Sequence, residues 1–430
     1  MTEIAITGLG VVCRLGRGVE TFWAGVRAGA TADADRVPDP DLKVPLPLYY
    51  LVPDEDPAPE GTVGPGPGPR DAVEPAPQDA VGSAPESTVG PAPQDAVAPA
   101  PRDSVGPATR YTLEAGLEAC ADARLDTVPG SRIAVVMGSS VGDARQVELA
   151  RAGQVPPVAD ASPPFTLASA LAAEIGAGAG AVNLSNACAG SGYAIAMGAE
   201  MIRSGEADVV VAGGAEAYSR VTVAAFNQMG ALAPDRPRPF DRDRAGVVLG
   251  EGAGVVVLES AAHARARDAR MYATLAGSGW SCDAAHPTAP DPSGAQAGRA
   301  MRAALAEAGA GPGEVRLIVP HATGTRLNDS TESAAMGAVF GDRLGAIPLH
   351  NLKAVVGHLA GGAGVLGTVL AALCFHHGAV PGNPPTAAPD PGCPVRLPTG
   401  ETELSSGVAL VNAYAFGGNN ISLALTGAPS

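Results

Sequence analysis

The sequence is short of aromatic residues and of positive charge, and both shortages argue against nucleic acid as a ligand. Aromatic side chains make up 4% of the 430 residues, too few for the stacking platforms that bind single strands. Lysine and arginine together number 28 against 44 aspartate and glutamate residues, so the formal net charge is -16. A nucleic-acid-binding surface needs a basic patch, and we therefore expect an acidic surface with no nucleic-acid partner.

Paired cysteines and long apolar runs are also missing. The cysteines lie singly, with no CxxC spacing, which predicts a reducing compartment and no disulfide framework. No secretory leader precedes the first apolar stretch, residues 4–12. The longest membrane-like stretch, residues 359–375, is rich in glycine and shorter than the ~20 apolar residues of a spanning helix. These features predict a cytoplasmic protein with no membrane segment.

Proline is abundant, but much of it lies in one tract. Residues 31–109 read as an insert rich in proline and alanine, and an octapeptide repeat occupies residues 69–108. Proline at this density cannot sustain a helix or a strand ladder, and one valine per eight residues cannot build a core. We expect a disordered insert; a scaffold function, in which the repeat recruits partners, is the competing hypothesis.

Outside the insert, buried strands alternate with helices, which is typical of an α/β fold. Residues 132–138, 207–214 and 315–319 read as buried strands, as does the segment before His358. Residues 294–308 and 332–340 read as helices. The two halves, residues 1–260 and 261–430, repeat this alternation of strands and helices and suggest a duplicated α/β unit. Gly8 and Gly10 do not indicate a dinucleotide site, because Cys13 stands where the third glycine of the fingerprint belongs.

Cys188 has the most informative position in the chain. It lies in a run of small residues, 185–192, after the apolar residues 181–184 and before a helix-like segment, 193–202. A helix N-terminus stabilises a thiolate, although a lone cysteine is more often a small core residue. Cys188 is therefore a candidate nucleophile that needs support from other residues.

That support comes from His321, His358 and Lys353, which all lie in turns of small residues and glycine. A thiolate can take up an acyl group, and neutral imidazole N–H groups can stabilise an enolate oxygen. Two histidines therefore fit acyl transfer with carbanion chemistry better than a cysteine protease, which needs one histidine and an orienting residue. The wide spacing of these residues does not suit a zinc site, and we expect no metal.

The ordered set of motifs closely resembles the elongating β-ketoacyl-acyl carrier protein synthases of types I and II, over the whole chain except the proline tract. The motifs that carry the resemblance are residues 186–190, 239–246, 250–254, 321–325, 328–332, 353–358 and 412–420. The resemblance implies a thiolase fold, with a duplicated five-layered αβαβα core and mixed sheets. It also implies an acyl carrier protein as partner and either a homodimer or a heterodimer with a ketosynthase-like subunit.

The resemblance also assigns roles. Cys188 is expected to take the acyl chain, and the backbone N–H groups of Cys188 and Phe416 to form the oxyanion hole. His321 and His358 are expected to hold the malonyl thioester oxygen and assist decarboxylation. No cofactor is expected to be bound, since the substrates are carried on the phosphopantetheine of the carrier protein.

Other positions receive supporting roles from the same resemblance. Lys353 is expected to act electrostatically near the second histidine and to pair with Glu332. Phe416 matches a gate that moves when Cys188 is acylated. The remaining matched positions are Thr323 and Thr325, which would bind pantetheine, and the supporting residues Asp329, Gly417 and Gly418.

The expected activity is an acyltransferase of the β-ketoacyl synthase type, performing decarboxylative Claisen condensation in specialised polyketide or fatty acid biosynthesis. An acyltransferase that uses the same cysteine, or a non-elongating partner subunit resembling a chain-length factor, is the alternative. Three departures from the family pattern bear on this choice: Ala322 replaces a glycine, Ala354 a serine, and Ala415 the glycine that normally hinges the gate.

Overall fold

The computed structural model describes residues 2–29, 34–37, 39–45, 48–54, 105–155 and 166–428. Strands from both halves of the chain form a continuous mixed sheet in the order β11-β14-β15-β10-β1-β9-β7-β5-β6. The halves meet where β1 (Ile4–Cys13) pairs antiparallel with β10 (Ala273–Cys282), with Ile4 opposite Leu275.

The two halves of the sheet have related strand directions. In the first half, β5 is parallel to β6 and β7, and β9 is antiparallel to β7 and β1. In the second half, β11 is parallel to β14, and β15 is antiparallel to β14 and β10. The bounds of these strands are β5 (Ile133–Gly138), β6 (Gly180–Leu184), β7 (Val209–Glu216), β9 (Gly252–Ser260), β11 (Val315–Val319), β14 (Val408–Tyr414) and β15 (Asn419–Gly427). This shared pattern supports the predicted duplication.

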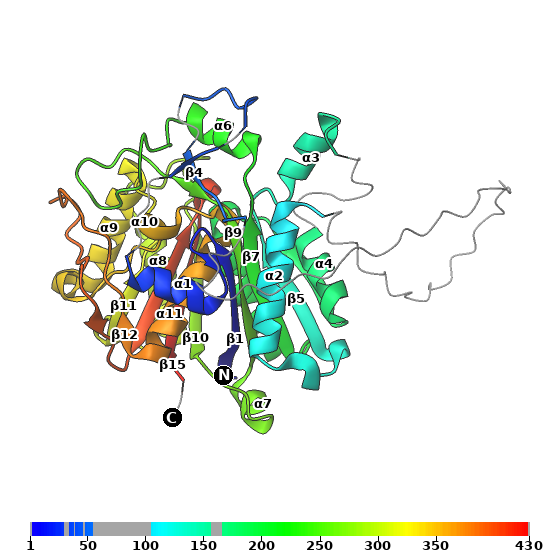
Figure 1. The fold of residues 1–430 in the computed structure, drawn as a ribbon. Helices are drawn as coiled ribbons and strands as arrows, with labels where there is room; N and C mark the ends of the chain where they lie inside the picture. Colours follow the sequence, from blue (N-terminus) through cyan, green and yellow to red (C-terminus); the bar gives the residue numbers. More distant parts are fainter. Residues whose placement is uncertain are drawn as a thin grey trace, which may run out of the picture.

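Helices cover both halves of the sheet and fill the space between them (Figure 1). α2 (Pro107–Asp122) and α4 (Thr166–Ile175) pack on the outer face of the first half, and α8 (Ala295–Glu307) packs on the second, next to α9 (Arg326–Phe340). α5 (Gly190–Arg203) and α11 (Ala363–His377) contact strands of both halves. The result is the predicted five-layered α/β arrangement.

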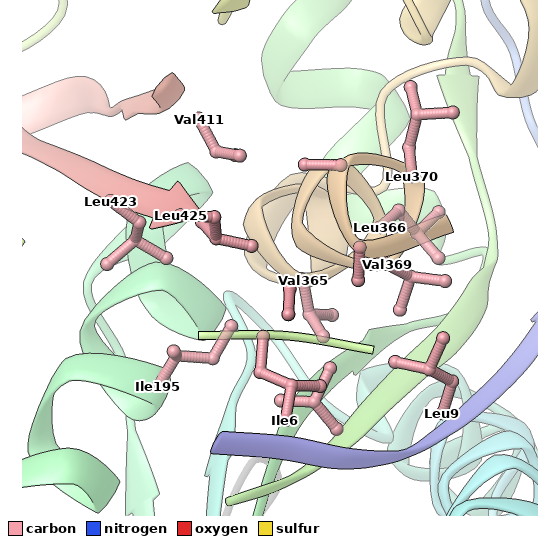
Figure 2. Packing of buried hydrophobic residues seen from close by; sticks show 14 of the residues in the cluster. Ile6, Leu9, Ile195, Val365, Leu366, Val369, Leu370, Val411, Leu423 and Leu425 are labelled. Carbon is pink, nitrogen blue, oxygen red and sulfur yellow. The ribbon is translucent and has the colours of Figure 1, made fainter. Parts of the chain in front are cut away.

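The main hydrophobic core surrounds the middle helices. Side chains of α5 and α11 meet those of strands from both halves, as Figure 2 shows for Ile195, Val365 and Leu366 beside Ile6 and Leu425. Within the described ranges, Ala360–His377 is the one stretch whose length and composition would suit a membrane span, and 83% of it is buried inside the protein. The expectation that residues 359–375 form a buried helix is therefore confirmed.

Gly8 and Gly10 have a packing role in β1. A Cβ at Gly8 would lie 2.2 Å from the carbonyl oxygen of Ala119, and one at Gly10 would lie 1.9 Å from that of Ala115. Both carbonyls belong to α2, so the missing side chains let α2 approach the strand closely. This contact accounts for the glycine pair without a nucleotide.

The predicted insert, residues 31–109, was drawn too wide at both ends. β3 (Asp35–Arg36) and β4 (Leu48–Tyr50) form a small sheet with β8 (Leu249–Gly250), in which Tyr49 is 1% exposed. At the other end, α2 begins at Pro107. The prediction missed β4 because it rested on the average composition of residues 31–109, which the proline tract dominates. The octapeptide repeat lies outside the described residues except for 105–108, and the division of the chain at residue 260 stays a prediction.

The remaining helices, strands and 3-10 turns connect these layers. They are β2 (Gly16–Arg17), α1 (Val19–Arg27), η2 (Leu125–Thr127), η3 (Gly130–Arg132), α3 (Ala144–Arg151), η4 (Ala187–Ala189), α6 (Arg220–Gln228), α7 (Ala261–Ala266), η5 (Pro312–Glu314), η6 (Gly341–Ala346), α10 (Lys353–Val356), η7 (Ala360–Gly362), β12 (Ala379–Val380), β13 (Thr402–Glu403) and η8 (Phe416–Gly418).

Candidate active site

A cavity of about 440 Å³ brings together most of the residues singled out in the sequence. Its walls include side chains from both halves of the chain, although Cys188 and His321 are 133 positions apart in the sequence. The predicted residues that line it are Cys188, His321, Thr323, Thr325, Glu332, His358 and Phe416. The other predicted residues do not line the cavity: Lys353, Asp329, Gly417 and Gly418.

Cys188 lies in η4, between the end of β6 and the start of α5, and is 6% exposed. The preceding Ala187 has a φ of 45°, a left-handed conformation that is uncommon outside glycine. The backbone N–H groups of Cys188 and Phe416 both lower the pKa of the thiol, which indicates that the segment of Phe416 lies near Cys188. The oxyanion hole expected from these two N–H groups stays a prediction.

Burial opposes ionisation of the thiol. It raises the pKa of Cys188 to about 12, and the negative charge of Glu216 raises it further. Lys353 and the two backbone N–H groups lower the pKa, but by less. Removal of the sulfur from water thus disfavours the thiolate at rest, and stabilisation of a thiolate by the start of α5 stays a prediction.

His321 and His358 form an edge-to-face pair with ring centroids 5.4 Å apart and an interplanar angle of 86°. His321 follows β11, and His358 follows α10. Burial lowers the pKa of both rings well below 6.5, and the nearby Lys353 lowers it further. Both imidazoles are therefore neutral near pH 7, and each can present an N–H group to a substrate oxygen.

The Nδ1 atoms of both rings are buried and have no hydrogen-bond partner in the part of the chain that the structure describes. Buried polar atoms in proteins are nearly always paired, and an exception calls for an explanation. These two atoms do not face the open cavity, so other atoms of the two rings must line it. A bound molecule would contact the imidazoles through those other atoms.

Glu332 holds the segment that carries His321. Its carboxylate accepts hydrogen bonds from the backbone N–H groups of His321 and Ala322, both at 2.7 Å. No ion pair joins Glu332 and Lys353, two described residues that we expected to pair. Burial raises the pKa of Glu332 and lowers that of Lys353, while each charge favours the charged form of the other. Each charge thus stabilises the other, although no direct ion pair joins these two described residues, and their functional pairing stays a prediction.

Asp329 and the two threonines organise the start of α9. The carboxylate of Asp329 accepts hydrogen bonds from the backbone N–H groups of Phe240, at 2.8 Å, and Gly324, at 3.1 Å. Thr325 is the N-cap of α9, and its hydroxyl lies 3.0 Å from that of Thr323. These contacts give all three residues a local structural role, while the two threonines also face the cavity.

The gate segment packs against α6. The rings of Phe416 and Phe226 have centroids 5.5 Å apart, and both rings line the cavity, as does Met229. Ala415 has φ -140° and ψ 156°, extended values that any residue adopts. The left-handed residues of this turn are Gly417, with φ 81°, and Gly418, with φ 78°. Ala415 is therefore unstrained here, and the positions of this turn that favour glycine lie two and three residues later. A gating movement of Phe416 stays a prediction.

Sequence reasoning missed one buried carboxylate of this region, that of Glu216 at the end of β7. The available signal was a charged residue at the end of a fully apolar strand. In the part of the chain that the structure describes, no group of three or more His, Cys, Asp or Glu side chains is arranged to hold a metal ion.

Comparison with protein-family models gives two matches. Residues 70–264 match the N-terminal domain of β-ketoacyl synthases, and residues 272–386 match the C-terminal domain. Among curated proteins, nodulation protein E of Rhizobium meliloti is 41% identical over 243 residues, covering 56% of this chain and 60% of that protein. The 3-oxoacyl-[acyl-carrier-protein] synthase 2 of Rhizobium meliloti (strain 1021) is 38% identical over 250 residues, covering 56% of this chain and 59% of that protein. The aligned segments thus span less than two thirds of these relatives.

Solved structures align over the full chain. The ishigamide ketosynthase/chain length factor is 32% identical, with a TM-score of 0.83 and complete coverage of both chains. A type II polyketide synthase complex, AntDE:AntF, described as an acyl-carrier protein with its ketosynthase bound to the hexaketide, is 25% identical with a TM-score of 0.81. It covers 99% of this chain and 100% of that chain. The sequence matches and the structural matches therefore both lie among β-ketoacyl synthases and ketosynthases.

Proposed function

The chain belongs to the β-ketoacyl synthase family, with the thiolase fold of its structural neighbours, and from that premise we propose that it catalyses decarboxylative Claisen condensation. The substrates would be an acyl thioester and a malonyl thioester, each on the phosphopantetheine arm of an acyl carrier protein. The observation that carries the proposal is the convergence of Cys188, His321 and His358 on one cavity.

The first half-reaction loads the enzyme. The Cys188 sulfur bonds to the acyl carbon, the bond from that carbon to the pantetheine sulfur breaks, and the thiol proton passes to the departing pantetheine. The N–H groups of Cys188 and Phe416 stabilise the oxyanion of the tetrahedral intermediate. Because burial favours the protonated Cys188 thiol at rest, the proton would leave as the sulfur attacks, and one of the two histidines that line the same cavity would relay it to the departing pantetheine.

The second half-reaction forms the carbon–carbon bond. The malonyl thioester loses carbon dioxide, and the electron pair of the broken bond forms an enolate whose oxygen accepts hydrogen bonds from His321 and His358. The enolate carbon then attacks the acyl carbon, the bond to the Cys188 sulfur breaks, and the released thiolate takes up a proton. Neutral imidazoles suit this task because their N–H groups stabilise the developing charge without a proton transfer. Lys353 adds a positive charge behind both rings.

The pantetheine arm would lie along the side of the cavity formed by Thr323 and Thr325. Both hydroxyls can rotate to donate or accept, which suits the amide groups of the arm. No cofactor bound to the enzyme itself is part of the proposal. The partners would be an acyl carrier protein and a second subunit, either an identical chain or a ketosynthase-like one, in the cytoplasm.

Intact-mass measurement after incubation with an acyl-loaded carrier protein tests the loading step. We expect the wild-type protein to gain the mass of one acyl group and Cys188→Ala to gain none. Cys282→Ala is the matched control, since Cys282 is an exposed thiol, and it should acylate like the wild type. Acylation that persists in Cys188→Ala, or its absence from the wild type, would contradict the proposal.

A further inference from the structure

Glu216 carries a buried carboxylate that none of the roles above uses. It ends β7, between β5 and β9, and is 1% exposed. Both of its oxygens accept hydrogen bonds. The donors to Oε1 are Ser139 Oγ (2.8 Å), Val141 N (3.0 Å) and Gly142 N (3.2 Å), and those to Oε2 are Ser140 N (2.8 Å) and Gly361 N (2.9 Å).

This environment suits the ionised form of Glu216. Four of the five donors are backbone N–H groups, and Ser139 Oγ accepts a hydrogen bond from Gly142 N at 2.8 Å, so its own proton is directed to the carboxylate. A protonated carboxyl would place its O–H against a donor. No cationic side chain among the described residues forms an ion pair with Glu216. Burial raises its pKa on balance and the backbone donors lower it, and it is the donor geometry, a nest of N–H groups around an anion, that favours the charged form.

The donors come from two segments that meet at the site. Residues 139–142 follow β5, and Gly361 is three residues after His358. Their backbones touch, since a Cβ at Gly361 would lie 2.6 Å from the Cα of Ser139. The end of β5 also packs against the turn that carries Cys188, residues 187–190, which we call the nucleophile turn. A Cβ at Gly138 would lie 2.2 Å from the carbonyl carbon of Gly190. The Glu216 carboxylate therefore ties the segment after His358 to the segment that supports Cys188.

We propose that Glu216 is a positioning residue of the site, whose ionised carboxylate holds the His358 segment against the nucleophile turn. The proposal rests on the proposed function in assigning His358 and Cys188 to one reaction. The negative charge has a second consequence. Glu216 and Lys353 are charged groups near the Cys188 thiol, and the first raises its pKa while the second lowers it; His321 and His358 face the same cavity as neutral rings. Because the carboxylate binds the segment that packs against the turn of Cys188, we expect its charge to disfavour the thiolate.

The charge is tested by the rate at which iodoacetamide alkylates Cys188, followed by peptide mass between pH 7 and pH 9. Only the thiolate reacts, so the rate follows the thiolate fraction. We expect Glu216→Gln to react faster than the wild type at every pH, because the neighbouring negative charge is gone. Glu216→Asp keeps the negative charge but disturbs the hydrogen bonds of this carboxylate. It therefore measures how altered access of iodoacetamide to Cys188 changes the rate, and it should not show this acceleration.

Glu251→Gln is the matched control at a distance. Glu251 is also buried and accepts hydrogen bonds from Val52 N and Tyr218 N, both at 3.0 Å, and from Tyr111 Oη. It does not line the cavity and is not among the largest causes of the Cys188 pKa shift, so its variant should alkylate like the wild type. Equal rates for the Gln and Asp variants at Glu216, or equal acceleration by Glu251→Gln, would overturn the electrostatic role.

The positioning role is tested by malonyl-thioester decarboxylation. Both Glu216→Gln and Glu216→Asp should lower kcat more than they raise KM, because His358 loses its place while the cavity remains. Wild-type kcat and KM in both variants would overturn the positioning role. If Glu216→Gln does not fold, Ser139→Ala removes a single donor to the carboxylate. It should lower kcat by less, and its alkylation rate should not rise, because the charge of Glu216 is kept. A wild-type protein that does not decarboxylate the malonyl thioester would refute the proposed function. The order of the alkylation rates of the wild type and the variants would still decide the charge effect of Glu216.

Discussion

Three alanines beside the site have left-handed backbone conformations. Ala187, with φ 45°, precedes Cys188, and Ala322, with φ 38°, follows His321. Ala360, also with φ 38°, lies two residues after His358. An L-residue pays roughly 1 kcal/mol or more for this conformation. Strained backbone of this kind persists where the surrounding structure enforces it, and it accompanies functional side chains.

Replacing one of these alanines by glycine should be tolerated far better than the same change in a helix. Ala322→Gly removes left-handed strain, whereas Ala335→Gly, in α9 and equally buried, only adds backbone freedom to the unfolded chain. We expect the free energy of unfolding to be higher in Ala322→Gly than in Ala335→Gly by roughly 1 kcal/mol. Chemical denaturation of the two variants measures this difference, and equal losses would contradict it.

A buried histidine outside the cavity should make the protein sensitive to acid. His350 is fully buried, its Nδ1 lies 3.0 Å from the Pro381 carbonyl oxygen, and burial lowers its pKa to about 4. The unfolded chain binds this proton near pH 6.5 and the folded chain does not. Stability is therefore full above pH 6.5 and is lost as the pH falls towards 4, by roughly 3 kcal/mol for a difference of this size.

The variant His350→Gln isolates this effect, since its amide can still donate to the Pro381 carbonyl but does not titrate. Its free energy of unfolding should fall less between pH 6.5 and pH 4 than that of the wild type. Denaturant titrations at several pH values give both slopes. Parallel pH dependences in the two proteins would rule out His350 as the source.

At the scale of single elements, the gate depends on the η8 turn. A Cβ at Gly418 would lie 2.7 Å from the Cβ of Asp283, and its φ of 78° strains any side chain. Gly418→Ala should therefore lower the free energy of unfolding by about 1–3 kcal/mol. It should also slow acylation of Cys188, because the turn carries the N–H of Phe416. Gly400→Ala, where a Cβ meets nothing within 4 Å, should change neither quantity, and similar losses in both variants would show that the turn is not special.

Sequence patterns predicted some helices and strands well and others poorly. The buried strands and α8 were predicted within a few residues, because their apolar periodicity is long and regular. The segment before His358 was taken for a strand, whereas residues 353–356 form α10, and short apolar runs do not distinguish the two. α9 begins at Arg326, earlier than the predicted residue 332, because Thr325 caps a polar first turn. Local chemistry of this kind outweighs hydrophobic pattern at element ends.

At the scale of the whole molecule, the site depends on long-range pairing that spacing alone cannot predict. Cys188 and His358 come together because strands of both halves join one sheet and α5 and α11 lie between them. Only the resemblance to a known family placed these residues together beforehand. The protonation state of Cys188 and the contacts of Glu332 and Glu216 depend on burial, which the sequence does not contain.

Deletion of the repeat tests where the fold ends. Removal of residues 69–104 should leave the thermal unfolding midpoint and the loading of Cys188 unchanged, because α2 begins at Pro107. Removal of residues 69–108 should lower the midpoint. It takes away the first turn of α2, where Ala108 is fully buried and its N–H donates to Asp143 at 2.8 Å. Equal behaviour of the two deletions would show that this turn contributes nothing to the fold.

The central claim is that one cavity both loads Cys188 and forms a carbon–carbon bond. The most direct measurement is a single turnover in which protein acylated at Cys188 is mixed with malonyl-loaded acyl carrier protein and all masses are followed together. We predict that the acyl group leaves Cys188 as a β-ketoacyl thioester on the carrier, with one carbon dioxide released per acyl group, and that His358→Ala keeps its acyl group. Transfer of the intact acyl group to an amine or alcohol without release of carbon dioxide would contradict the account.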